Sequence, residues 1–201
     1  NIFKRNKRIL LFLIKEKMLI FDEFVAKNII AKEYVMAQYP QYFYPELKPF
    51  LIEEWFLKSL DENRKWINNL NKELPEDFED KRKAGENDSY ICTLIRKDLI
   101  QEFVVYVNKT NISLKSQIKP SIYETNHFFV SMHYMPTLIQ YAFFYGSIRI
   151  IRYLMLNGVN LDKDLLIYAI HSNNPELINL LEENNLTEYK PEQIEEYFNE
   201  S

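Results

Sequence analysis

The side chains best suited to metal binding or nucleophilic catalysis are three histidines and one cysteine. They are His127, His133, His171 and Cys92. No two of them have the i,i+4 spacing on one predicted helix, or the C-x-x-C spacing, that is typical of metal ligands. A Cys–His nucleophile also needs a third group to orient the histidine, and nothing in the sequence places one. We therefore expect no metal ion, no cofactor and no catalytic residue.

Paired carboxylates could act as acid and base, but the pairs in this sequence are adjacent residues. They are Glu53-Glu54, Glu182-Glu183 and Glu195-Glu196. Adjacent side chains on a helix point about 100° apart, as they do on solvated faces. The scattered glycines, Gly85, Gly146 and Gly158, cannot form the glycine-rich loops that hold phosphate groups. An enzyme whose catalytic groups meet only in the folded chain remains a third alternative.

Composition and charge exclude further classes of protein. A single cysteine rules out an intramolecular disulfide framework and fits a reducing compartment, so we expect an intracellular, cytoplasmic protein. The net charge of −4 argues against nucleic-acid binding by the whole chain. The longest apolar run, residues 9–14, is far shorter than the roughly 20 residues of a membrane span. Because residue 1 is Asn rather than Met, we also expect the chain to be part of a longer one.

An internal repeat indicates the helices that would position any functional site. Residues 137–160 read TLIQYAFFYGSIRIIRYLMLNGVN, and residues 164–187 read DLLIYAIHSNNPELINLLEENNLT. A shift of 27 residues places Tyr141 on Tyr168 and aligns the two segments without a gap. Repeats of this length are typical of stacked helical architectures.

Each copy has the pattern of a helical hairpin, with two apolar stripes separated by a short turn. Gly146 ends the first helix and Gly158 the second, because glycine readily adopts the positive φ of a helix end. Asn173 and Asn185 take these places in the second copy, and Asn is the next most tolerant residue. Ser147 is the expected N-cap of the second helix in the first copy.

Weaker copies of the pattern precede these two. Residues 88–112 carry both helical stripes, and residues 2–19 carry only that of the second helix. We therefore predict an all-α fold, a helical-hairpin solenoid that forms a single domain over residues 1–201.

Residues 35–88 form an irregular insert in this pattern. Pro40, Pro45 and Pro49 should prevent a regular helix before about Leu51. Residues 38–56 hold these prolines among aromatic residues, and we call them the proline–aromatic segment. The aromatic residues fit a satellite core better than an exposed recognition loop, which remains the alternative. Residues 75–88 are the expected exposed loop.

Two capping signals lie outside the clear repeats. Asp22 is the expected N-cap of a helix over residues 22–34. Ser121 and Glu124 have the spacing of a capping box, which predicts a helix that continues through about Val130.

The unit from Thr137 to Asn160 resembles an ankyrin repeat. The family pattern T-P-L-H-x-A-A-x-x-G-H, followed by V-V, L-L and G-A-D, falls on it without a gap, and the unit from Asp164 follows with Asn in the glycine places. The Asn-, Ile- and Tyr-rich helices are similar to those of the expanded ankyrin families of protists. The T-P-L-H tetrad is altered in both copies, and the repeat is shorter than the roughly 33 residues of the family. The resemblance implies an ankyrin-like solenoid with shortened or absent β-hairpin fingers, which binds proteins without catalysis.

The resemblance also implies where a partner would bind, because the ends of the first helices face the concave groove in that family. Tyr141, Phe144, Tyr145, Tyr168 and His171 fall there, and exposed aromatic side chains can act as binding hot spots. We expect a protein partner, with no small-molecule substrate, nucleic acid or membrane span. Two alternatives stay open. The aromatic residues could serve only packing, or the chain could be a structural spacer in a larger scaffold protein.

Overall fold

The computed structural model describes residues 6–31, 38–53, 74–130 and 135–187. Every regular element in these ranges is helical, and one isolated antiparallel bridge joins Gln117 to Thr137. The all-α prediction is confirmed for these residues. Some predicted features lie outside them, namely residues 2–5, 32–37 and 54–73, His133, Glu195-Glu196 and the side chain of His127.

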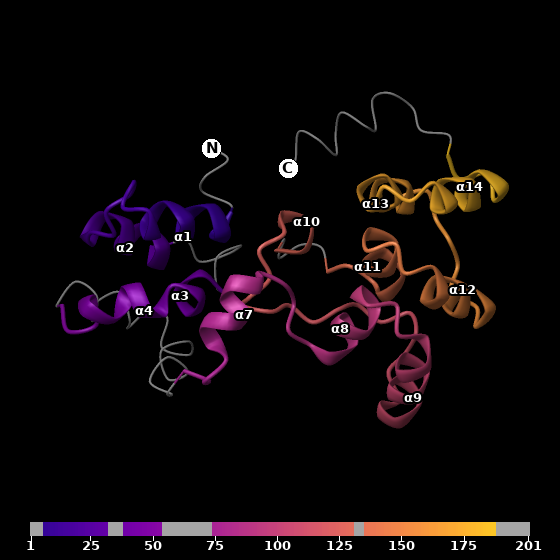
Figure 1. Cartoon of the computed structure of the whole chain (residues 1–201), viewed down its shortest axis with the longest axis horizontal. Helices are drawn as coiled ribbons and strands as arrows, with labels where there is room; N and C mark the ends of the chain where they lie inside the picture. Colours follow the sequence, from indigo (N-terminus) through magenta and orange to yellow (C-terminus); the bar gives the residue numbers. More distant parts are fainter. Residues whose placement is uncertain (1–5, 32–37, 54–73, 131–134, 188–201) are drawn as a thin grey trace. The chain divides into compact units, whose positions relative to one another are not determined.

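The helices gather into two compact units (Figure 1). The first is formed by residues 1–87 and 120–133, and the second by residues 88–119 and 134–201. The single domain over the whole chain stays a prediction.

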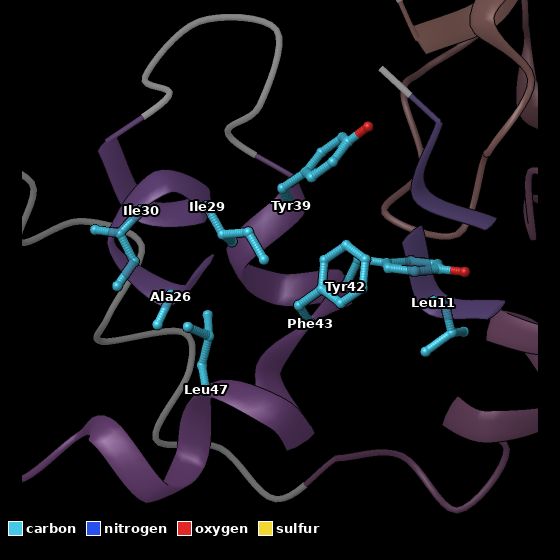
Figure 2. Packing of buried hydrophobic residues seen from close by; sticks show 8 residues of the cluster. All are labelled: Leu11, Ala26, Ile29, Ile30, Tyr39, Tyr42, Phe43 and Leu47. Carbon is cyan, nitrogen blue, oxygen red and sulfur yellow. The ribbon is translucent and has the colours of Figure 1, made fainter. Parts of the chain in front are cut away.

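The first unit is built around a cluster of aliphatic and aromatic side chains. Its elements are α1 (Lys7–Lys15), α2 (Glu23–Ala31), α3 (Tyr39–Tyr42), α4 (Tyr44–Leu47), the 3-10 turn η2 (Lys48–Phe50), α7 (Phe78–Ala84) and α10 (His127–Val130). The buried cluster lies among α1 to α4 (Figure 2) and consists of Leu11, Ala26, Ile29, Ile30, Tyr39, Tyr42, Phe43 and Leu47. Half of these residues come from the proline–aromatic segment, so the prediction of a satellite core there is confirmed.

The prolines of this segment shorten its helices without abolishing them. Pro40 lies in the first turn of α3 and Pro45 in the first turn of α4, and each helix has 4 residues. A proline in the first turn lacks only an N–H that would have no partner in the helix. The prediction that no helix forms before about Leu51 is therefore wrong for single turns.

The expected exposed loop over residues 75–88 contains a helix, α7, so the prediction of a loop is wrong there, although most residues of the segment are exposed as predicted. Phe78 and Arg82 lie one turn apart, and both are buried. Arg82 donates to a Glu46 carboxylate oxygen at 2.6 Å, and its guanidinium carbon lies 5.0 Å from the centre of the Tyr42 ring. The charge of Arg82 is thus paired inside the unit, and Gly85 ends the helix with φ of 69°.

The two capping predictions in this unit have opposite outcomes. Asp22 caps α2, because its Oδ1 accepts from the Val25 N–H at 2.9 Å. No capping box forms at Ser121, because the Glu124 carboxylate instead accepts from the backbone N–H groups of Asn87 and Asn126. Residues 121–126 are non-helical, and α10 begins only at His127.

The described residues of the second unit form three helical hairpins. They pair α8 (Tyr90–Arg96) with α9 (Ile100–Thr110), α11 (Leu138–Phe144) with α12 (Ile148–Leu156), and α13 (Leu165–Ser172) with α14 (Pro175–Glu183). The helices of the last two hairpins begin at positions that the 27-residue shift relates, and they end within one residue of such positions. The predicted hairpins of residues 88–112, 137–160 and 164–187 are therefore present.

The turns inside the three hairpins share one geometry. Asp98, Gly146 and Asn173 have φ of 48°, 69° and 51°. In each turn the N–H of this residue donates to the carbonyl oxygen three residues earlier. The turn is thus the same in all three copies, although the residue type differs.

The second helices also end alike. Asn111, Gly158 and Asn185 have φ of 51°, 79° and 56°, and the N–H of the following residue donates to the carbonyl oxygen five residues before it. In the first unit α1 ends in the same way at Lys17, with φ of 57°. This is the helix end of the predicted half repeat.

The N-cap of α12 comes from the neighbouring hairpin rather than from Ser147. The Ser147 hydroxyl donates to the Ile95 carbonyl oxygen at 2.6 Å and makes no cap hydrogen bond. The Asp98 carboxylate instead accepts from the backbone N–H groups of Arg149 at 3.2 Å and Ile150 at 3.0 Å. The Ser147 prediction is therefore wrong in its hydrogen bond, and Asp98 joins two successive hairpins.

Candidate functional site

The first helices of the three hairpins lie side by side. Helix α11 packs against α8 and against α13, while α9 packs against α12 (Figure 1). Side-chain contacts between their last turns show that the C-terminal ends of α8, α11 and α13 lie together.

These contacts run without a break from α8 to α13. The Arg96 guanidinium donates to the Tyr141 hydroxyl at 2.7 Å and lies 6.0 Å from the centre of the Tyr145 ring. The Tyr145 and Phe144 ring centres are 5.1 Å apart. The Phe144 ring stacks on the His171 imidazole, with centres 5.3 Å apart and planes inclined by 25°. We call Arg96, Phe144, Tyr145 and His171 the aromatic surface.

The predicted site residues divide into an exposed and a buried group. Phe144 and Tyr145 are half-buried and His171 is exposed. Tyr141 and Tyr168 are only 0% and 5% exposed. They occupy equivalent positions of the repeat, so their rings belong to the packing between helices and not to the exposed side.

Sequence reasoning missed Arg96. Its donor bonds to Tyr141 and to the Thr93 hydroxyl hold the guanidinium beside the Tyr145 ring. The only signal in the sequence was a basic residue in the last turn of a first helix, as His171 is in α13. Contact between residues 45 positions apart cannot be read from a local pattern.

The first unit contains a fully buried lysine. The Lys7 ammonium donates to the carbonyl oxygens of Ile122 and Glu124 at 2.9 and 3.2 Å, and lies 5.5 Å from the ring centres of Tyr39 and Tyr42. Burial lowers the pKa of Lys7 from 10.5 to about 7, and the nearby Glu124 opposes this shift. These contacts tie α1 to residues 122–124 and make Lys7 a determinant of stability.

The described residues show no arrangement for metal binding. Cys92 is buried in α8, and no group of three or more His, Cys, Asp or Glu side chains in this part of the chain could hold a metal ion. Among the described helices, none combines the length and the apolar character needed to cross a membrane.

No protein-family model, curated protein or solved structure matches the chain. The aromatic surface is therefore interpreted from its own geometry.

Proposed function

We propose that the second unit binds a protein partner through the aromatic surface. The observation that carries this proposal is the contiguity of the surface, to which three successive hairpins each contribute at least one side chain. Aromatic and arginine side chains are the residues that most often supply binding energy at protein interfaces. The half-buried rings of Phe144 and Tyr145 can lose further solvent contact without any change in the helices.

The proposed scaffold is an ankyrin-like solenoid. Its support is the repeated hairpin, with one turn geometry at Asp98, Gly146 and Asn173, together with the row formed by α8, α11 and α13. In such a scaffold the ends of the first helices face the groove in which partners bind. The partner of this chain would then cover the aromatic surface along that row.

A structural spacer is the competing function. One observation favours it, because the Arg96–Tyr145 and Phe144–His171 contacts each join successive hairpins. The same side chains would then stiffen the stack without any partner. Neither function requires catalysis, and we propose none.

Two double variants separate these functions. Phe144→Ser/Tyr145→Ser removes both rings from the aromatic surface. Val105→Ser/Leu156→Ser is the matched control, because these side chains on α9 and α12 are 65% and 87% exposed and lie on second helices. Circular dichroism must first show equal helix content in both variants.

The assay is affinity capture followed by titration. Proteins captured from native lysate by the wild type are identified by mass spectrometry, purified, and titrated against the three baits. A binding module loses at least about tenfold in affinity with the first variant and keeps its affinity with the control. Equal affinity of all three baits for every captured protein would favour the spacer.

A further inference from the structure

The last described hairpin exposes apolar positions that the two preceding hairpins bury. These positions are the second and the sixth residue of each first helix. In α8 and α11 they are all buried and are occupied by Ile91, Ile95, Ile139 and Phe143. In α13 the equivalent residues are Leu166, which is half-buried, and Ile170, which is 61% exposed.

The row of first helices accounts for this difference. Helix α11 packs against α8, and α13 packs against α11, but no further first helix follows α13 among the described residues. The second helices differ in the same way, because Ile151 of α12 is fully buried and its equivalent in α14, Ile178, is half-buried. In stacked repeats each unit buries its surface against a neighbour, and the outermost unit is covered by a capping element with a polar outer face.

The sequence beyond the described hairpins repeats the pattern of a first helix. Helices α11 and α13 share a buried aliphatic residue followed three residues later by a buried tyrosine. The pairs are Leu138 and Tyr141, and Leu165 and Tyr168. Residues 194–197 read IEEY and have the same pattern with Ile in place of Leu. They follow the pair in α13 by 29 residues, against 27 residues between the pairs of α11 and α13.

Residues 191–198 lie outside the described residues, and their sequence is that of a short amphipathic helix. Pro191 is a favoured residue of a first helical turn. The apolar residues Ile194, Tyr197 and Phe198 have the i, i+3, i+4 spacing of one stripe. The acidic residues fall on the opposite side of such a helix and are Glu192, Glu195 and Glu196. The segment therefore combines an apolar inner face with a polar outer face.

We propose that residues 191–198 form a capping helix that packs against α13 and covers Leu166 and Ile170. This helix takes beside α13 the place that α13 takes beside α11, and it closes the row of first helices. Burial of Ile170 against Tyr197 and Phe198 provides the driving force, because apolar surface is removed from water. The proposal does not depend on partner binding, since neither Leu166 nor Ile170 belongs to the aromatic surface.

The test measures whether a thiol at position 170 is accessible. Ile170→Cys is made in the whole chain, and Leu156→Cys is the control because Leu156 is 87% exposed on α12. The native Cys92 is buried. The rate of labelling by a maleimide is measured for both proteins. Position 170 should react at least about fivefold more slowly than position 156, because labelling requires the capping helix to open.

Variants of the segment identify what covers position 170. Tyr197→Ser/Phe198→Ser should raise the labelling rate at position 170 about threefold or more and leave the rate at position 156 within about twofold. Glu195→Ser/Glu196→Ser is the matched control, because it changes the same number of residues on the opposite face and should alter neither rate. Circular dichroism must show that the hairpins remain folded in every variant.

Three results would overturn the proposal. One is a labelling rate at position 170 that equals the rate at position 156 in the unaltered segment. Another is slow labelling at position 170 that Tyr197→Ser/Phe198→Ser leaves unchanged and that slows further as protein concentration rises, which would assign the surface to a second copy of the chain. The third is slow labelling that depends neither on concentration nor on the segment variants, which would assign the cover to other residues.

Discussion

The three glycines of the chain have similar backbone angles and different surroundings, so alanine substitutions should separate conformational from steric cost. Gly85, Gly146 and Gly158 have φ of 69°, 69° and 79°. A Cβ at Gly158 would meet nothing within 4 Å, and one at Gly146 would lie 3.6 Å from Asn174 Nδ2 in ordinary contact. A Cβ at Gly85 would lie 2.8 Å from the Thr125 Oγ1, which is too close to be accommodated without movement.

The expected costs follow from these distances. An L-residue with a side chain in the left-handed region costs about 1–2 kcal/mol, which applies to all three glycines. At Gly85 the new methyl group also displaces Thr125, whose hydroxyl and N–H both donate to the Gly85 carbonyl oxygen at 2.9 and 3.1 Å. Loss of one such bond adds about 1 kcal/mol. Gly85→Ala should therefore lower the free energy of unfolding by about 2–3 kcal/mol, against about 1–2 kcal/mol for Gly146→Ala and Gly158→Ala.

The assay is urea unfolding followed by circular dichroism, with the wild type and the three variants at one protein concentration. The reasoning is refuted if Gly85→Ala is no more destabilising than Gly158→Ala, because their backbone angles alone do not distinguish them.

The remaining stability predictions concern the turn at Gly146, the cap on α12 and the buried lysine. Gly146→Val should lower the free energy of unfolding by on the order of 1–3 kcal/mol. Gly146→Asn should stay near the wild type, because Asn173 occupies the equivalent turn position with φ of 51°. Unchanged stability of the valine variant would contradict the hairpin register. Asp98→Ala should cost about 1–2 kcal/mol in urea unfolding because α12 loses its N-cap, and no loss would show that the capping bonds are unimportant. The pKa of Lys7 is about 7 in the folded chain, against an ordinary value of 10.5, so between these pH values the folded chain binds fewer protons than the unfolded chain. The free energy of unfolding should therefore rise with pH by up to about 1.4 kcal/mol per pH unit above pH 7. Lys7→Met should remove this part of the rise, as measured by urea midpoints at pH 7, 8 and 9, and an identical pH profile would contradict the shift.

The hairpins of the second unit were predictable because their turns require particular residue types. Only Gly, Asn and Asp take the positive φ readily, and the sequence repeats such residues at 146, 158, 173 and 185. The apolar stripes between them then define the helices. Asp22 was likewise predictable as the N-cap of α2, because Asp is a preferred residue at a helix start.

Features that depend on distant partners could not be predicted in this way. Arg82 lies in a segment with the charge density of an exposed loop, and its burial in α7 depends on its ion pair with Glu46, 36 residues away. Ser147 has the sequence of an N-cap, but Asp98 of another hairpin satisfies the N–H groups of α12. Glu124 does not form the expected capping box, because its carboxylate accepts from the backbone N–H of Asn87, 37 residues away.

The candidate site was predicted only in part, for the same reason. The resemblance to ankyrin repeats implied Phe144, Tyr145 and His171, because the alignment of the repeats places them at the ends of the first helices. It could not show that Tyr141 is buried. Nor could it identify Arg96, whose position beside Tyr145 depends on the packing of α8 against α11.

The most direct test of the binding function is the affinity of a purified partner for the wild type, for Phe144→Ser/Tyr145→Ser and for Val105→Ser/Leu156→Ser. All three proteins must show the same helix content. We predict that the first double variant weakens binding at least about tenfold and that the control stays within about twofold of the wild type. Equal affinity of the three proteins would contradict a binding role for the aromatic surface.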